Sequence, residues 1–315
     1  MKKSDFHKLN HFEKSRMPIG ELSKYYADLR AYEYNNGKEL KGIGARQINH
    51  GLVKLILKAD QRIANEKIIV LNNQSSNGKA SKIYACTHIG GNDIQRTLQV
   101  IGVPAYLMLG DPGILYRDIA YQGLRINGLI SLDNDNRIDR NIAYSRSVEL
   151  LRKGGNLLIF PEGAWSISPN LLLMKIFTGT VRMAKETGAE IIPIAVEQYE
   201  KDFYFNIGQN YKISKNSLKS AEELTDELRE KMATLKWEIL ENQKISSRKN
   251  IPEGYLQEFE DEILGRCNYE SGMAREDLER ERFHDKRITN PQDAFVFMDK
   301  LKPCINNAFL FRRDV

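Results

Sequence analysis

The sequence predicts an α/β protein with a largely parallel central sheet flanked by helices, a helical N-terminal segment and a charged helical C-terminal extension. Between about residues 80 and 210, short apolar runs alternate with amphipathic stretches of helical periodicity. Residues typical of helix caps and turns separate them, at Asp111-Pro112, Gly154-Gly155 and Gly188. This alternation is typical of strands connected by crossover helices.

The expected strands are five short runs rich in branched and aromatic residues. Active sites of such sheets lie at the carboxyl ends of the strands, so residues that directly follow a strand are candidates for chemistry. The strands are expected at 82–86, 105–109, 129–132, 156–160 and 191–196, and the helices at 93–101, 113–122, 138–152 and 171–187.

Composition divides the chain into three parts. Residues 1–79 are expected to be a helical segment that can lie on a membrane surface, residues 80–242 the main domain, and residues 243–315 a helical extension. Ser220 and Glu223 form a capping box, which predicts a long helix from there to about residue 242.

An amphipathic helix is expected at about residues 46–63. One of its faces is an apolar stripe, and basic residues at a spacing of four occupy a neighbouring face. Such a helix can lie in a lipid interface, or its stripe can pack on the α/β core, and the pattern leaves both open. The stripe comprises Ile48, Leu52, Leu55, Ile56, Ala59 and Ile63, and the basic residues are Lys54, Lys58 and Arg62.

The overall composition is typical of a globular protein. The 315 residues are 41% hydrophobic and 28% charged, which is enough for a sizeable core, and the net charge of +5 suits an anionic partner. The three cysteines lack CxxC spacing, so we expect neither a disulfide framework nor a metal site. Cys86 lies in an apolar run and is expected to be buried rather than nucleophilic.

Hydropathy gives no reason to expect a membrane span or a secretory signal. No apolar run approaches the roughly 18–20 residues that cross a bilayer, and the basic start lacks an apolar core. We therefore expect a cytoplasmic protein, peripheral at the inner face of the membrane. The basic charge is accompanied by no nucleic-acid recognition motif, so no nucleic-acid partner is expected.

The first candidate motif, "HIGGND", directly follows the strand expected at 82–86. His88 can act as a general base near neutral pH, and Asp93 can orient its ring. Gly90 and Gly91 permit the tight turn that brings the two side chains together and leave room for a substrate. The alternative is a His–Asp pair that only caps the following helix.

The second candidate motif, "FPEG", follows the strand expected at 156–160. Pro161 ends the strand, Glu162 places a carboxylate at the mouth of the sheet, and Gly163 lets a ligand approach the backbone. The alternative is an ordinary turn with a solvated glutamate.

In this order, the motifs resemble those of the glycerolipid acyltransferase superfamily, the lysophospholipid or 1-acylglycerol-3-phosphate acyltransferase-like enzymes. The family's His-X4-Asp motif matches His88 and Asp93. Its Phe-Pro-Glu-Gly motif matches residues 160–163, and its apolar strand with proline matches residues 192–194. The resemblance covers about residues 80–242.

The chain departs from the family pattern at two places. The second motif is only partly matched at 128–134, where Asn134 stands instead of the usual arginine, and the third motif continues with Trp165 where the family has arginine. The resemblance implies catalysis by His88 and Asp93. The substrate-binding residues that it implies are Gly90, Gly91, Asn134, Phe160, Pro161, Glu162, Gly163, Trp165, Ser166 and Pro193.

The resemblance implies an O-acyltransferase that moves a fatty acyl group from acyl-CoA or an acyl carrier protein to a hydroxyl of a lysophospholipid or related lipid. No bound cofactor and no metal are implied. Neither Asn134 nor Trp165 carries a charge for a phosphate, which favours a neutral or glycosyl hydroxyl as acceptor unless Arg137, Arg140 or Lys175 supplies that charge. The alternatives are a glycan or glycolipid acceptor, or a non-catalytic lipid-binding protein.

Overall fold

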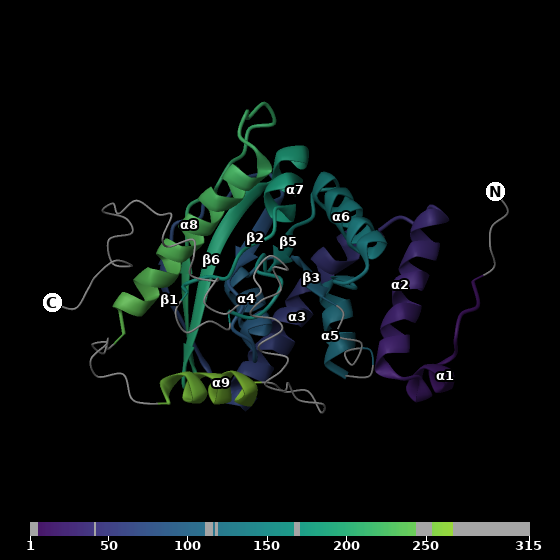
Figure 1. The fold of residues 1–315 in the computed structure, drawn as a ribbon, viewed down its shortest axis with the longest axis horizontal. Coiled ribbons are helices and arrows are strands. Elements are labelled where there is room, and N and C mark those ends of the chain that lie inside the picture. Colours follow the sequence, from purple (N-terminus) through teal and green to yellow (C-terminus); the bar gives the residue numbers. More distant parts are fainter. Residues whose placement is uncertain are drawn as a thin grey trace.

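The computed structural model describes residues 6–40, 42–110, 116, 119–166, 171–243 and 254–266. A seven-stranded sheet of order β1-β7-β6-β2-β5-β3-β4 runs through them, and every neighbouring pair is parallel except the antiparallel pair β6–β7 (Figure 1). The predicted fold class is confirmed. The strands are β1 Lys67–Asn73, β2 Lys82–Cys86, β3 Tyr106–Gly110, β4 Leu129–Leu132, β5 Leu157–Ile159, β6 Glu190–Tyr199 and β7 Asp202–Ile207.

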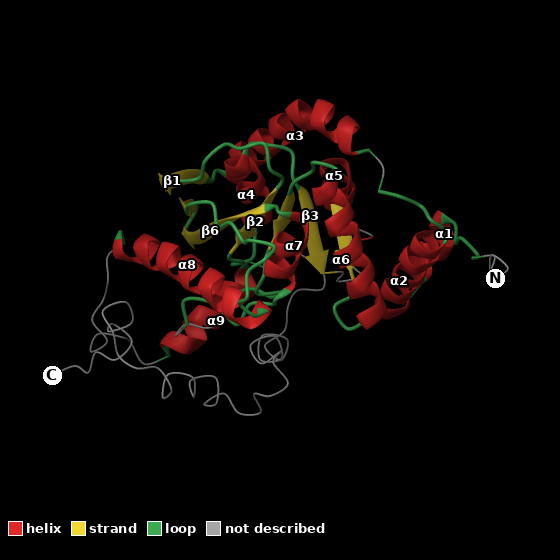
Figure 2. Cartoon of the chain, turned by 90° about the horizontal axis from the view of Figure 1, so that it is seen from above, coloured by secondary structure: helices red, strands yellow, loops and turns green. Residues whose placement is uncertain are grey.

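Helices cover both faces of the sheet (Figure 2). Helices α3, α4 and α5 lie on one face, and α6, α7 and α8 lie on the other. The helices are α1 His11–Arg16, α2 Ile19–Asn35, α3 Ile43–Ala64, α4 Asp93–Ile101, α5 Ile119–Asn127, α6 Arg137–Arg152, α7 Gly179–Thr187, α8 Ala221–Glu241 and α9 Tyr255–Gly265.

Strand β2 shows how the sheet separates two cores. Its side chains alternate, so Ile83 and Ala85 pack with α6, α7 and α8, whereas Tyr84 and Cys86 pack with α3 and α4. All five residues of the strand are buried. A strand buried on both faces in this way ends in a rigid position, and His88 follows two residues later.

All five predicted strands are present, but two further strands were not predicted. Strand β1 lies inside residues 1–79, so the expectation that this segment is helical is wrong there. It is a half-exposed edge strand with polar residues at its end, and its pairing with β7 is long-range. Strand β7 follows a tight turn in which Glu200 has φ 53°, and that turn sets the antiparallel pairing. The domain boundaries at 79 and 242 remain predictions.

The predicted helix at 171–187 begins only at Gly179. The residues before it are held in a loop, because the amides of Met174 and Phe177 donate to the Glu162 carboxylate and the Pro161 carbonyl instead of to a helical ladder. The Ser220–Glu223 capping box is confirmed at the start of α8. The expected Asp111-Pro112 cap and most of the helical extension expected at 243–315 lie outside the described residues.

Helix α3 packs through Val53 and Leu57, and the predicted apolar stripe points away from the core. Ile48 and Ile63 are 84% and 87% exposed, and Leu52, Leu55 and Ile56 are each more than half exposed. The alternative in which the stripe packs on the α/β core is therefore wrong. Among the described residues, no helix combines the length and apolarity needed to cross a bilayer.

A buried arginine joins α3 to α4. Arg96 has no exposed surface, and its guanidinium donates to Glu66 at 2.5 Å and to Asp60 at 2.8 Å. The second oxygen of Glu66 accepts from Asn92 at 2.7 Å, one residue before Asp93. The start of α4 is thereby fixed to the end of α3.

Replacing Arg96 by Leu should lower the free energy of unfolding by about 3 kcal/mol, because the Glu66 carboxylate is left inside the protein without its cation. Urea denaturation followed by circular dichroism measures this. The matched control is Arg62→Leu on the exposed face of α3, which should change stability by no more than about 0.5 kcal/mol. Equal effects of the two substitutions would contradict the role given to Arg96.

Candidate active site

The predicted pair of His88 and Asp93 is brought together at the carboxyl end of β2. Nδ1 of His88 lies 2.8 Å from Oδ2 of Asp93, the first residue of α4. Gly90 and Gly91 have φ values of 86° and 60°, so the turn between them uses the left-handed conformation that favours glycine. The geometry expected for this turn is confirmed.

Asp93 is wholly buried and strongly held. Its Oδ2 also accepts hydrogen bonds from the amides of Ile89 at 2.7 Å and Gly90 at 3.0 Å. A carboxylate in this position requires Nδ1 of His88 to carry the proton, which leaves Nε2 as the nitrogen that can accept one. The buried negative charge also stabilises the imidazolium that forms when it does.

Two aromatic rings fix the plane of the His88 imidazole. Phe160 stacks on it with ring centroids 4.3 Å apart, and Trp165 meets it edge-on at 6.0 Å. Trp165 also lies against Gly90, where an added Cβ would be 2.8 Å from the indole ring. The second motif therefore packs directly on the first, although 72 residues separate His88 from Phe160 in the chain.

Glu162 follows the carboxyl end of β5, as predicted, but it is buried, so the alternative of an ordinary turn with a solvated glutamate is wrong. It has no exposed surface. Its carboxylate accepts from the Ser166 hydroxyl at 2.7 Å, the Met174 amide at 2.8 Å and the His88 amide at 3.3 Å. Burial raises the pKa of Glu162, and the nearby Lys236 ammonium opposes that rise. Glu162 thus connects three backbone segments around the catalytic pair.

The remaining residues of the second motif shape the same loop. Gly163 has φ 69°, and an added Cβ there would be 2.5 Å from the Phe177 ring. Pro161 accepts from the Phe177 amide, and the Ser166 amide donates to the His88 carbonyl. These contacts hold the loop that carries Trp165 against the turn after β2.

Pro193 and Asn134 are not gathered around His88. Pro193 is buried within β6 opposite Ala85. Asn134 follows β4 at the edge of the sheet, where its amide lies against Gly110. Three strand spacings separate β4 from β2, which corresponds to about 14 Å. Their roles in substrate binding stay predictions.

Three basic residues could supply the charge that is missing at Asn134 and Trp165, and the structure places two of them away from His88. Arg140 donates to the Asn134 carbonyl, and Arg137 is exposed at the start of α6. Lys175 is exposed on the loop that Glu162 holds. Of the three, only Lys175 is in the part of the fold that forms the site.

Sequence reasoning missed buried cations on α8. Arg229 donates to the Leu173 carbonyl at 2.8 Å and the Met174 carbonyl at 3.2 Å, and burial lowers its pKa. Lys236 pairs with Glu197 at 2.8 Å. The sequence analysis predicted the helix that carries these residues, but no local signal indicated that a buried carboxylate lies near them.

Cys86 is buried, as predicted. Its sulfur lies 3.7 Å from the Thr97 hydroxyl, and burial raises its pKa well above the ordinary value.

The described ranges contain no group of three or more His, Cys, Asp or Glu side chains that could hold a metal ion.

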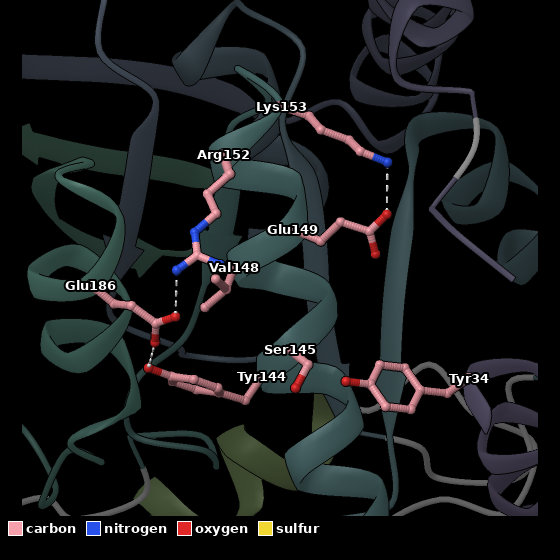
Figure 3. A pocket seen from close by; sticks show the side chains of 8 residues that line it. All are labelled: Tyr34, Tyr144, Ser145, Val148, Glu149, Arg152, Lys153 and Glu186. Carbon is pink, nitrogen blue, oxygen red and sulfur yellow. Dashed lines mark hydrogen bonds and ion pairs between the residues drawn. The ribbon is translucent and has the colours of Figure 1, made fainter. Parts of the chain in front are cut away.

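A cavity of about 440 Å³ lies away from the catalytic pair, against α2, α6 and α7 (Figure 3). Its charged side chains bind one another, with Arg152 2.9 Å from Glu186 and Lys153 2.8 Å from Glu149. Because none of the predicted site residues lines it, this cavity is not the active site.

Residues 67–197 match the Acyltransferase family. The match covers less than half of the chain. The match begins at β1 rather than at residue 80, which agrees with the place of β1 in the sheet.

Individual relatives are distant. The chain is 23% identical over 156 residues to a 1-acyl-sn-glycerol-3-phosphate acyltransferase of Borreliella burgdorferi, and 24% identical over 166 residues to an uncharacterised acyltransferase of Schizosaccharomyces pombe. These alignments cover 50% and 51% of this chain and span 61% and 57% of the relatives' own lengths.

The fold is that of a solved acyltransferase. The crystal structure of the 1-acyl-sn-glycerophosphate acyltransferase PlsC from Thermotoga maritima superposes with a TM-score of 0.51 at 15% identity. The superposition covers 72% of this chain and 95% of that chain, so it extends well beyond the motif region.

Replacing Glu162 by Gln should destabilise the fold by about 1–3 kcal/mol, because the amide nitrogen of Gln would face a backbone N–H in place of an acceptor oxygen. The measurement is the shift of the urea midpoint. A group that only touches substrate would leave this midpoint unchanged. Glu241→Gln, at an exposed position on α8, is the control and should stay within about 0.5 kcal/mol.

Proposed function

We propose that the protein is an O-acyltransferase that acylates a free hydroxyl of a lysophospholipid, such as lysophosphatidic acid, with an acyl thioester as donor. The observation that carries the proposal is the buried bond between His88 and Asp93, which prepares Nε2 to accept a proton. The family match and the name of the Borreliella burgdorferi relative support this substrate class. The donor is acyl-CoA or an acyl carrier protein.

The reaction follows from the geometry of the pair. Nε2 of His88 removes the proton of the acceptor hydroxyl, and its oxygen attacks the thioester carbonyl. A carbon–oxygen bond forms, the carbon–sulfur bond breaks, and the imidazolium returns the proton to the leaving thiolate. Asp93 keeps the ring in the required tautomer throughout and stabilises the cation. No serine or cysteine nucleophile is needed.

A neutral or glycosyl acceptor is the second candidate. Trp165 stands edge-on to His88 where a family arginine would supply charge, and a flat indole suits an apolar or sugar surface. Incubation with labelled acyl-CoA and a membrane lipid extract, followed by mass spectrometry of the labelled product, discriminates between the two acceptors.

His88→Ala should lower the rate of acyl transfer by roughly 10²–10⁴-fold or more, because the general base is lost. Asp93→Asn should cost the same or less, since it disturbs the orientation and charge of the base. Labelled acyl-CoA consumption measures both. His7→Ala, an exposed histidine, is the control, and full activity of His88→Ala would refute the mechanism.

We further propose that α3 binds the surface of an anionic membrane. Its exposed apolar stripe would enter the lipid interface, and Lys54, Lys58 and Arg62 are exposed on the same helix to meet lipid phosphates. On this proposal the enzyme acts at the inner face of the membrane, where we expect its lipid acceptor.

Charge reversal of Lys54, Lys58 and Arg62 to Glu should weaken binding to vesicles of phosphatidylglycerol and phosphatidylcholine by tenfold or more, since each basic residue contributes about 1 kcal/mol. Co-sedimentation at increasing salt measures this, and wild-type binding should fall with salt. The same three reversals at Lys201, Lys215 and Lys231, outside α3, give a control of equal net charge. Unchanged binding of the α3 variant would exclude this surface.

A further inference from the structure

The C-terminal helix α9 packs on the active site. We propose that α9 is a lid that must move away before the acyl donor and the acceptor can both reach His88. The proposal rests on the proposed function in one respect: it requires that the substrates bind next to His88. Nothing in the sequence motifs involves α9, which begins at Tyr255, 90 positions after Trp165.

Two contacts join α9 to the catalytic loop. Trp165 packs against Ile263, with Phe259 and Leu264 around them, in a cluster separate from both sheet cores. At the end of the helix, the Arg266 guanidinium donates to the Ile89 carbonyl at 3.2 Å, between His88 and Gly90. The helix therefore touches both halves of the site: the turn after β2 and the loop after β5.

The site is closed in this arrangement. The His88 side chain is only 11% exposed, with Phe160 on its face and Trp165 at its edge. Proton transfer requires the acceptor hydroxyl within about 3 Å of Nε2, with the thioester carbonyl beside it. Two substrates cannot both reach Nε2 of His88 unless a group that covers it moves. Trp165 and α9 pack together outside the two sheet cores, so they are the covering group that can move.

The attachment of α9 suits a movable element. Ile263 is the one fully buried side chain of its cluster among the described residues, whereas the acidic residues Glu258, Asp261 and Glu262 are exposed. An element held by few buried apolar contacts opens more readily than the core. Opening would uncover the indole of Trp165, an apolar surface on which an acyl chain can pack.

A reversible disulfide tests whether α9 has to move. A Cβ added at Gly91 would lie 3.8 Å from Cβ of Arg266, which is the usual separation in a disulfide. The variant carries Gly91→Cys and Arg266→Cys, with Cys267→Ser and Cys304→Ser to prevent other pairings. The oxidised protein should transfer acyl groups at least tenfold more slowly than the same protein after reduction with dithiothreitol. Equal rates in the two states would overturn the lid.

A second variant separates a lid from a fixed wall and does not depend on activity alone. Ile263→Asp, in a Trp237→Phe background, should raise acrylamide quenching of the Trp165 fluorescence at least twofold and leave acyl transfer undiminished. Glu258→Asp introduces the same side chain at an exposed position of α9 and should change neither property.

Quenching of Trp165 and the rate of acyl transfer together distinguish a movable lid from a fixed wall. Increased quenching together with a tenfold loss of transfer would show that α9 is a fixed wall of the site and overturn the lid. Unchanged quenching would also overturn it, because Trp165 would then not depend on α9 for its cover. If even the wild-type protein transfers no acyl group, the proposed function fails, while quenching of the oxidised and reduced disulfide variant still tests the lid.

Discussion

The site depends on one buried carboxylate. Asp93 has no exposed surface. Its Oδ2 accepts hydrogen bonds from the His88 ring and the amides of Ile89 and Gly90, and its Oδ1 has no hydrogen-bond partner among the described residues. A charge so placed is tolerated only if its donors are fixed. The fixed donors come from a turn that two left-handed glycines make possible, at the end of a strand buried on both faces. The sheet therefore fixes, through this turn, the position of Nε2 of His88.

A second buried carboxylate extends this constraint to distant parts of the chain. Glu162 binds the backbone of His88 on one side and that of Met174 on the other, and Arg229 of α8 holds the carbonyl of Met174. A continuous series of hydrogen bonds thus runs from α8 to the backbone of His88, the proposed base. The glutamate of the second motif is consequently a positioning residue, and its substrate-binding role in the predicted set has no support in this geometry.

The spacing of His88 and Asp93 across a short glycine turn made the pair a candidate, and the second motif with the family resemblance favoured it over a pair that only caps a helix. Periodicity likewise predicted five strands and the exposed alternative for α3. It could not predict that Glu162 turns inward, because that depends on Met174 and Ser166 closing around it. The distance of Asn134 from the site was also not predictable, since strand order is set by long-range pairing rather than by sequence order.

Both helices that flank the core act on the same turn. Arg96 and Glu66 fix the first residues of α4 to the end of α3, which carries the exposed apolar stripe. Arg266 of the C-terminal segment binds the Ile89 carbonyl in the same turn. Packed elements move as units rather than deforming continuously. A displacement of α3 or α9 would therefore shift the His88–Asp93 turn through only one or two intervening hydrogen bonds. The lipid contact proposed for α3 and the movement proposed for α9 would therefore both act beside the residues that hold the His88 ring.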